Sequence, residues 1–283
     1  DISGQYYDEL ILGYERQIGN RLKLGARGML RTLRRAVNGG SVMIVPVPDT
    51  GMEDWEYGPE VLGNPGFGAL DQYPEASRDY AALALTAEQT IGSGLMLVGS
   101  YVLSRTYGNY QGLFDTDYWA ASPNASSTWY NPLLLENTEG LLPQDRKHSF
   151  KLAASYMADF GLGAGASFLW QTGTPVSIRG GSAAPPMFAH LLPRGSMGRT
   201  PNLWDLDLRF VYDMRRLVRR GSATRLVLDV FNVGSPRTPL AYDEIFAFTR
   251  TEEGHMTDPN ANYMEVTHYQ RPMTFRIGVE VGF

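Results

Sequence analysis

The stretch that decides the fold is Met273-Thr274-Phe275-Arg276-Ile277-Gly278-Val279-Glu280-Val281-Gly282-Phe283. Every odd position carries a large apolar side chain, and every even position is polar, charged or glycine. Successive residues of a β-strand point to opposite faces of the sheet. This segment therefore predicts a strand with one apolar face and one wet face.

The same alternation recurs through the chain and predicts nine strands. They lie near residues 6–18, 21–33, 78–90, 95–107, 147–158, 162–172, 202–214, 224–234 and 271–283. The strand at 78–90 has the weakest pattern, because Tyr80 and Leu83 fall on opposite parities. Strands of about a dozen residues exceed the usual five or six of soluble sheets and suit a tilted membrane crossing. Length therefore argues against a soluble β-sandwich.

The connections between these strands alternate strictly in length. Short connections fall at 19–20, 92–94, 159–161 and 215–221, and long ones at about 34–77, 108–146, 173–201 and 235–270. Outer-membrane barrels have short periplasmic turns and long external loops. The sequence thus predicts an all-β, transmembrane antiparallel β-barrel meander. Because bacterial single-chain barrels have an even strand number, nine strands also predict that earlier strands are missing from this chain.

Composition excludes several classes of function. The chain has 283 residues, a net charge of −5 and no cysteine, so we expect no nucleic-acid partner and no thiolate site. Apolar runs long enough for a transmembrane helix are absent, and the start Asp1-Ile2-Ser3-Gly4 resembles no signal peptide. We expect the natural N-terminus to be missing or processed. We predict no enzyme activity, cofactor or metal.

Several motifs carry a family resemblance. Phe275, Ile277, Val279, Val281 and Phe283 resemble the assembly signal that the barrel-insertion machinery reads. The stretches 100–110, 145–152 and 226–233 look like late strands of TonB-dependent receptors. Residues 195–208, with Arg199-Thr200-Pro201-Asn202-Leu203-Trp204, look like the Oar-like subgroup, whose members often carry a carboxypeptidase-regulatory-like domain. The resemblance covers nearly the whole chain.

The resemblance implies a larger protein in the bacterial outer membrane. Such receptors have 22 strands around a plug and contact TonB through an N-terminal box. Residues 1–283 would then be the C-terminal portion of the barrel domain, about nine strands, with the plug and earlier strands absent. The implied function is energy-coupled traffic of an unknown external ligand. A passive porin or an adhesive surface barrel is the alternative.

Strand alternation also predicts which charged residues face the barrel lumen. They are Lys23, Arg27, Arg31, Asp205, Asp207, Arg209, Asp229, Arg276 and Glu280. The apolar residues between them, such as Leu206 and Ile277, are predicted to face lipid.

Other polar clusters are weaker candidates for a site. His148, Ser149 and Asp145 suggest hydrolytic chemistry, but neighbours on a strand point to opposite faces, so His148 is poorly placed to activate Ser149. Acidic residues near 243–260 and 49–56 suggest Ca²⁺, although their spacing matches no EF-hand loop. His190, His255 and His268 are too scattered to indicate a metal site. The arginines at 215–220 are better explained as a solvated turn than as a phosphate site.

Loop aromatics are the last candidates, because barrel mouths are plausible places for a ligand. They are Trp55, Tyr57, Tyr73, Tyr107, Tyr110, Trp119, Trp129 and Tyr130. Aromatic belts and loop packing explain most of them equally well.

Overall fold

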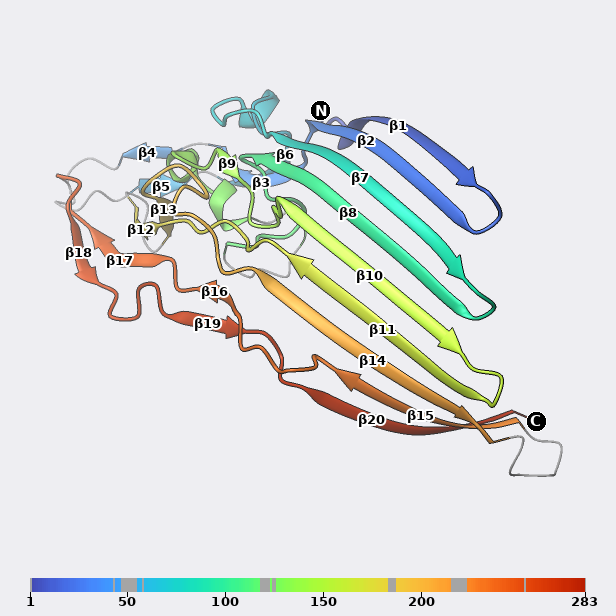
Figure 1. Ribbon diagram of the computed structural model, residues 1–283. Helices are drawn as coiled ribbons and strands as arrows, with labels where there is room; N and C mark the ends of the chain where they lie inside the picture. Colours follow the sequence, from blue (N-terminus) through green and yellow to red (C-terminus); the bar gives the residue numbers. More distant parts are fainter. Residues whose placement is uncertain are drawn as a thin grey trace.

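The computed structural model describes residues 2–42, 44–46, 55–57, 59–117, 123, 126–182, 187–214, 223–251 and 253–282. Its main element is one long, curved antiparallel sheet (Figure 1). The strands along it, in order, are β1 (Tyr6–Ile18), β2 (Leu22–Arg35), β7 (Arg78–Ile91), β8 (Leu95–Gly108), β10 (His148–Met157), β11 (Leu162–Gln171), β14 (Leu203–Asp213), β15 (Ala223–Phe231) and β20 (Thr274–Gly282). All nine predicted strands are confirmed, including the one at 78–90.

Each strand pairs with the next along this path, so the sheet is a meander. The described short turns, at 19–20, 92–94 and 159–161, lie at one end of the sheet, and the described parts of the long connections gather at the other end (Figure 1). Gly19 and Gly92 have φ of 62° in two of these turns, a conformation that glycine adopts without steric cost. The predicted segregation of short and long connections is confirmed.

The long connections contain structure that the alternation pattern did not predict. Two short antiparallel strand pairs form: β3 (Asn38–Ser41) with β6 (Glu60–Gly63), and β4 (Ile44–Pro46) with β5 (Trp55–Tyr57). The three-residue and four-residue strands are too short to show a period of two convincingly.

Two later connections are joined through a small sheet of their own. Its order is β13 (Phe188–His190), β12 (Arg179–Gly181), β17 (Ile245–Arg250) and β18 (Met256–Pro259). β16 (Pro239–Tyr242) pairs separately with β19 (Val266–Tyr269), and β9 (Gly140–Leu141) pairs antiparallel with the end of β8. The 3-10 helices are η1 (Gly68–Leu70), η2 (Ser127–Trp129) and η3 (Pro132–Leu135). Among the described residues, no helix is long or apolar enough to cross a bilayer.

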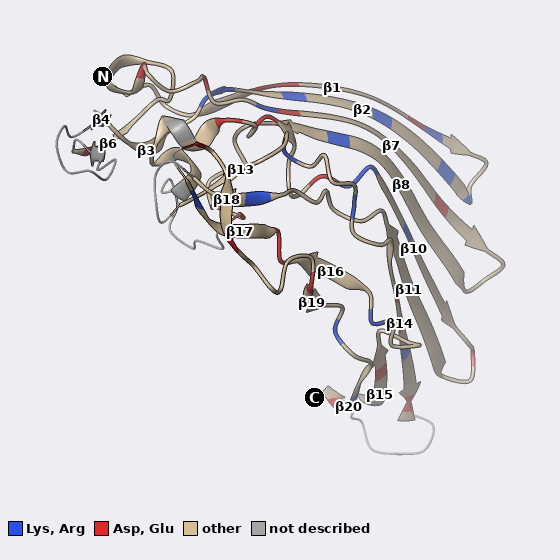
Figure 2. Cartoon of the chain, turned by 90° about the vertical axis from the view of Figure 1, so that its left-hand side faces the viewer, with Lys and Arg blue, Asp and Glu red and all other residues tan. Residues whose placement is uncertain are grey.

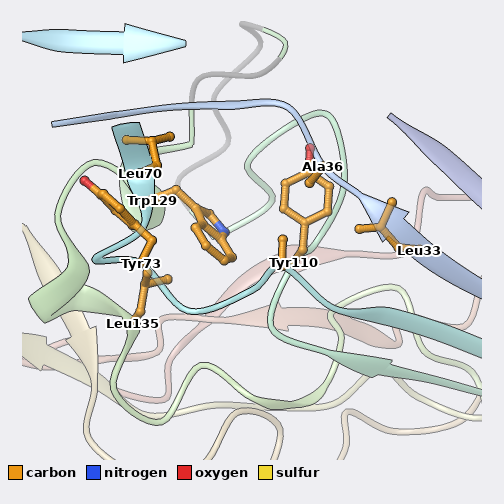
Figure 3. Packing of buried hydrophobic residues seen from close by; sticks show 8 residues of the cluster. Leu33, Ala36, Leu70, Tyr73, Tyr110, Trp129 and Leu135 are labelled. Carbon is orange, nitrogen blue, oxygen red and sulfur yellow. The ribbon is translucent and has the colours of Figure 1, made fainter. Parts of the chain in front are cut away.

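Of the buried hydrophobic clusters in the described residues, the larger is centred on the connections and includes only Leu33 from the main sheet. Tyr110 and Trp129 are fully buried, and their rings meet edge to face at 6.1 Å (Figure 3). Tyr73 stacks on the other side of Trp129 at 6.5 Å. Leu33, Ala36, Leu70, Ala76 and Leu135 complete this cluster. It joins the connections 34–77 and 108–146 into one packed unit.

This core corrects one interpretation of the loop aromatics. Tyr73, Tyr110 and Trp129 cannot line a ligand vestibule, because they are buried in loop packing. Burial raises the pKa of the Tyr73 and Tyr110 hydroxyls to about 12, so both stay protonated. Tyr107 and Tyr130 are partly exposed. Trp119 and the side chains of Trp55 and Tyr57 lie outside the described residues.

Candidate functional site

Most charged residues of the strands lie on one face of the sheet, with exceptions such as Arg16 and Arg105 on the other face. Cross-strand partners share a face, so the register can be followed from strand to strand. One row of partners from β2 to β14 comprises Lys23, Glu88, Val98, Ala153, Ser167 and Asp207. Arg209 lies two residues from Asp207 and continues the face through Asp229 to Arg276. The structure therefore places all nine residues predicted for the lumen on a single face, here called the polar face.

Ion pairs connect neighbouring strands across the polar face. Arg276 Nη2 lies 2.7 Å from Asp229 Oδ2, and Arg209 Nη2 lies 3.2 Å from Glu280 Oε1. At the other edge of the sheet, Lys23 pairs with Glu15 at 2.9 Å and Arg31 with Glu9 at 2.9 Å. The Asp229 side chain is buried, but its partner Arg276 and the other paired side chains are largely exposed to solvent. Exposed ion pairs contribute little stability, so these pairs favour a register more than they stabilise the fold.

The opposite face is mainly apolar. Its matching row comprises Leu24, Ala87, Gly99, Leu152, Phe168 and Leu206. On β20, Phe275, Ile277, Val279 and Val281 lie on this apolar face and are exposed, Ile277 to 80%. Phe283, the last residue of the expected assembly signal, lies outside the described residues.

Aromatic rings mark the loop end of the apolar face. The Tyr101 hydroxyl lies 2.7 Å from Nδ1 of His148, and the two rings stack at 6.1 Å. His148 also packs against Trp170 at 6.5 Å, and Trp170 is the cross-strand partner of Trp204. Aromatic belts of this kind lie at the headgroup level of membrane barrels.

The same contacts argue against a hydrolytic site at His148. The Ser149 hydroxyl accepts a hydrogen bond from Gln171. Asp145 accepts from the backbone of Thr106 and pairs with Arg199, so it does not orient His148. The three residues have the wrong partners for a catalytic triad.

The most polar buried site lies where three long connections meet, and we call it the loop cluster. It consists of Asp117, Arg179, His190, Arg194 and Glu244. Arg194 Nη1 donates to both carboxylate oxygens of Asp117, at 2.8 and 3.1 Å, and its Nε donates to the Thr138 carbonyl. Arg179 Nη1 donates to the Asp117 carbonyl at 2.8 Å. Arg194 and Asp117 are almost fully buried, with 1% and 5% of their side chains exposed.

Glu244 brings the third connection into the loop cluster. Its Oε2 lies 3.6 Å from Arg179 Nε, and its Oε1 accepts a hydrogen bond from the backbone of Ser177. The parallel pairing of β12 with β17 holds Arg179 and Glu244 in neighbouring positions, and the backbone N–H of Arg179 donates to the Glu244 carbonyl. Three segments that are far apart in sequence are therefore tied together by charge.

Burial and charge shift the titration of the loop cluster. Burial opposes ionisation of Asp117, but the nearby positive charges, Arg194 above all, hold the pKa of its carboxyl below the usual value. Burial, followed by the charge of Arg194, lowers the pKa of His190 to about 3. Burial raises the pKa of Glu244. His190 is thus neutral at neutral pH, and its 4.0 Å contact with Asp117 is not an ion pair there.

Beside the loop cluster lies a cavity of about 270 Å³. Asp117, Arg179 and Glu244 contribute to its wall, together with Gln144, Ser177 and Tyr242. Apolar residues supply much of the rest of the wall: Leu141, Pro143, Pro175, Val176, Leu240 and Ala241. An apolar pocket with a few charged, hydroxyl and amide groups is typical of small-molecule sites. This cavity is a candidate for ligand contact at the loop end of the sheet.

The loop cluster predicts a pH dependence of loop stability. If the loops opened, His190 would be exposed and would bind a proton below about pH 6.5. In the closed loop cluster, His190 stays unprotonated down to about pH 3. The closed state of the loops is therefore most stable above pH 6.5 and loses stability on acidification. Protonation of Asp117, below its ordinary pKa, also destabilises the closed state. Protonation of Glu244 stabilises it, because the pKa of Glu244 is raised in the closed state. Between pH 7.5 and 5.5 we expect about tenfold more frequent opening.

Hydrogen exchange of peptides covering 108–117 and 187–194 in the full-length protein, corrected for intrinsic rates, measures this opening. His190→Gln should remove the effect between pH 7.5 and 5.5. If wild-type exchange is independent of pH in that range, neutral burial of His190 is wrong.

The other candidate residues do not converge. Among the described residues, no group of three or more acidic or histidine side chains is arranged to hold a metal ion. Asp243 instead caps a turn, accepting from the backbone of Ile245 and the side chain of Asn260. His255 and His268 are exposed. Asp49, Glu53, Asp54, Glu252, the arginines at 215–220 and the side chain of Glu56 lie outside the described residues.

Sequence reasoning missed the central residues of the loop cluster. Asp117, Arg179 and Arg194 stand in irregular connections without a motif, and Arg194 is 77 positions from Asp117. His190 and Glu244 were considered only as possible metal ligands. Local patterning contains no signal for these contacts, because it cannot report which loops meet.

Comparison with known proteins agrees with this geometry. No family model matches the chain. The TonB-dependent transporter Oar of Myxococcus xanthus is 32% identical over 238 residues, which is 82% of this chain and 21% of that protein. The chain thus spans about a fifth of the length of this curated relative.

Among solved structures, the outer membrane transporter YddB from Escherichia coli resembles the chain in fold. The TM-score is 0.57 at 13% sequence identity, and the match covers 99% of this chain and 33% of that one. At this identity the likeness concerns the fold alone.

Proposed function

Because this chain belongs to the TonB-dependent receptors, we propose that its sheet is part of a receptor barrel that moves a ligand across the outer membrane with energy supplied through TonB. On the same basis we place the sheet in the outer membrane. The relation to the transporter Oar over most of the chain is the observation that carries the proposal. The two-faced sheet supports it, since a barrel wall needs one face for lipid and one for water.

The polar face is proposed to line the lumen. On β15, Val227 of the polar face is 6% exposed, whereas Leu226 of the apolar face is 42% exposed. Side chains crowd together on the concave side of a curved sheet, and Figure 2 shows how strongly this sheet curves from β1 to β20. The charged residues on this face would form a hydrated wall, part of which would contact a plug.

The two edge strands support the domain proposal. In the described residues β1 pairs only with β2, and β20 pairs only with β15. An unpaired edge in lipid leaves backbone groups unsatisfied at several kcal/mol each. We therefore propose that strands outside this sequence complete the barrel, with residues 1–283 as its C-terminal portion. The exposed apolar residues of β20 would serve the barrel-insertion machinery as its recognition signal.

The cavity beside the loop cluster is proposed as part of the external ligand site. The loop cluster ties together the connections after β8, β11 and β15, which all open at the same end of the sheet (Figure 1). A ligand that engaged Arg179 or Glu244 would therefore act on three loops at once. The residues around this cavity indicate that the ligand carries a polar group, and they do not specify the ligand further.

Two measurements on the full-length receptor test the proposed function: its ion conductance in a bilayer and its binding to TonB. The full-length receptor in planar bilayers should conduct ions poorly, because a plug fills the lumen. It should also bind the purified C-terminal domain of TonB, and a variant lacking its N-terminal segment before the plug should lose that binding. A passive porin would show the reverse: large, steady conductance and no TonB binding. That result would overturn the proposal.

A further inference from the structure

A groove of about 740 Å³ lies at the loop end of the sheet, on strands β1, β2, β7 and β8. This volume falls within the roughly 300–1,000 Å³ of small-molecule sites. Six leucines line it: Leu10, Leu12, Leu30, Leu83 and Leu103 from the strands, and Leu141 from the connection after β8. None of the residues discussed above for the lumen or the loop cluster belongs to its wall.

The register explains why the apolar face is hollow at this point. One row across the four strands is Leu10, Leu30, Ala81 and Arg105, and the next is Leu12, Gly28, Leu83 and Leu103. Gly28 stands between Leu12 and Leu83 in its row, Ala81 stands between Leu30 and Arg105 in the other, and both line the groove. Small residues at these two positions leave a depression with leucine walls on the apolar face.

The rim of the groove is positively charged. Arg105, Lys147 and Arg199 all line it. Arg199 is neutralised by Asp145, which also lines the groove. Arg105 and Lys147 are exposed and make no ion pair within the described residues; Arg105 lies over the ring of Tyr107 at 4.4 Å. An apolar channel with two unneutralised cations at one end is complementary to a molecule with an apolar chain and an anionic head.

The position of the groove relative to the aromatic belt sets its depth. Leu103 is the cross-strand partner of His148, which belongs to the belt with Tyr101 and Trp170. Belt aromatics lie at the headgroup level, so Arg105, one row nearer the loops, reaches the phosphate layer of the outer leaflet. The leucine rows reach from this level toward the hydrocarbon.

We propose that this groove binds a phosphate-bearing membrane lipid of the outer leaflet, with an acyl chain along the leucines and a phosphate at Arg105 and Lys147. A cation near a membrane surface contributes a modest attraction for an anionic lipid, and two together give about thirtyfold in affinity. Such a lipid would fix the loop end of these four strands at the membrane surface. The proposal depends on the position of the sheet in the outer membrane and not on any transported ligand.

The test is a lipid titration of the delipidated full-length receptor in detergent, followed by native mass spectrometry. The probes are bisphosphorylated lipid A and the same lipid after enzymatic dephosphorylation. Wild type should bind the phosphorylated lipid about thirtyfold more tightly. Arg105→Gln combined with Lys147→Gln should remove that difference. Arg16→Gln is the matched control, because Arg16 is an exposed cation on the apolar face near the opposite end of β1.

A second variant tests the apolar part of the groove. A Cβ at Gly28 would meet only the Leu12 carbonyl oxygen at 4.0 Å, so Gly28→Leu should fold while filling the groove. It should weaken binding of both lipids at least tenfold. Equal binding of the two lipids by wild type, unchanged binding in the double variant, or unchanged binding in Gly28→Leu would overturn the proposal. None of these readouts depends on TonB or on a transported ligand.

Discussion

Replacing Arg194 by methionine is expected to open the external loops. The substitution leaves Asp117 buried without the two hydrogen bonds that Arg194 donates to its carboxylate, and it removes the bond from Nε to the Thr138 carbonyl. Breaking a buried pair by removing one partner costs about 3–5 kcal/mol, because the remaining charge stays desolvated. Hydrogen exchange in segments 108–117 and 187–196 of the full-length receptor should rise by two orders of magnitude or more, while the sheet remains protected.

The matched controls separate charge from packing. Arg237→Met removes an exposed loop arginine and should leave exchange within experimental error of wild type. Asp117→Leu combined with Arg194→Met removes both charges and should recover much of the protection, as paired apolar replacements of buried ion pairs often do. Protection in Arg194→Met equal to that of wild type would show that the loop cluster does not hold the loops together.

Replacing Leu206 by arginine is expected to impair folding of the barrel. Leu206 lies on the apolar face of β14, opposite Phe168 of β11. An arginine on the lipid face near the bilayer midplane costs about 2–4 kcal/mol, because no water is available to solvate the guanidinium. Folding of the full-length receptor into lipid vesicles, followed by its resistance to protease and to urea, should report a loss of this size.

The control places the same charge at the same depth on the other face. Ser167 is next to Phe168 on β11, lies on the polar face and pairs with Asp207. Ser167→Arg should be tolerated, because an arginine there meets water and a carboxylate. If both variants fold equally well, the assignment of the apolar face to lipid is wrong.

The barrel wall could be predicted from the sequence because its cause is local. A membrane strand meets lipid on one side and water on the other at every residue, so alternation in Phe275–Glu280 reports the environment directly. The lengths of the connections predicted the antiparallel order of the strands, because short and long connections alternate as successive strands reverse direction. Even the weak strand at 78–90 follows this rule: Tyr80 lies opposite Arg31 on the polar face and Leu83 opposite Gly28 on the apolar face.

Tertiary structure alone decided what the long connections do. Tyr110 and Trp129 look in sequence like ligand-contacting loop residues, but they are the centre of a core between two connections. Arg194 and Asp117 form a buried pair across 77 positions, and Arg179 meets Glu244 only because β12 pairs with β17. In irregular segments, successive side chains do not alternate between two fixed environments, so their sequence shows no periodic pattern. Which of their side chains become buried depends on which loops fold against one another, and that is a property of the assembled chain.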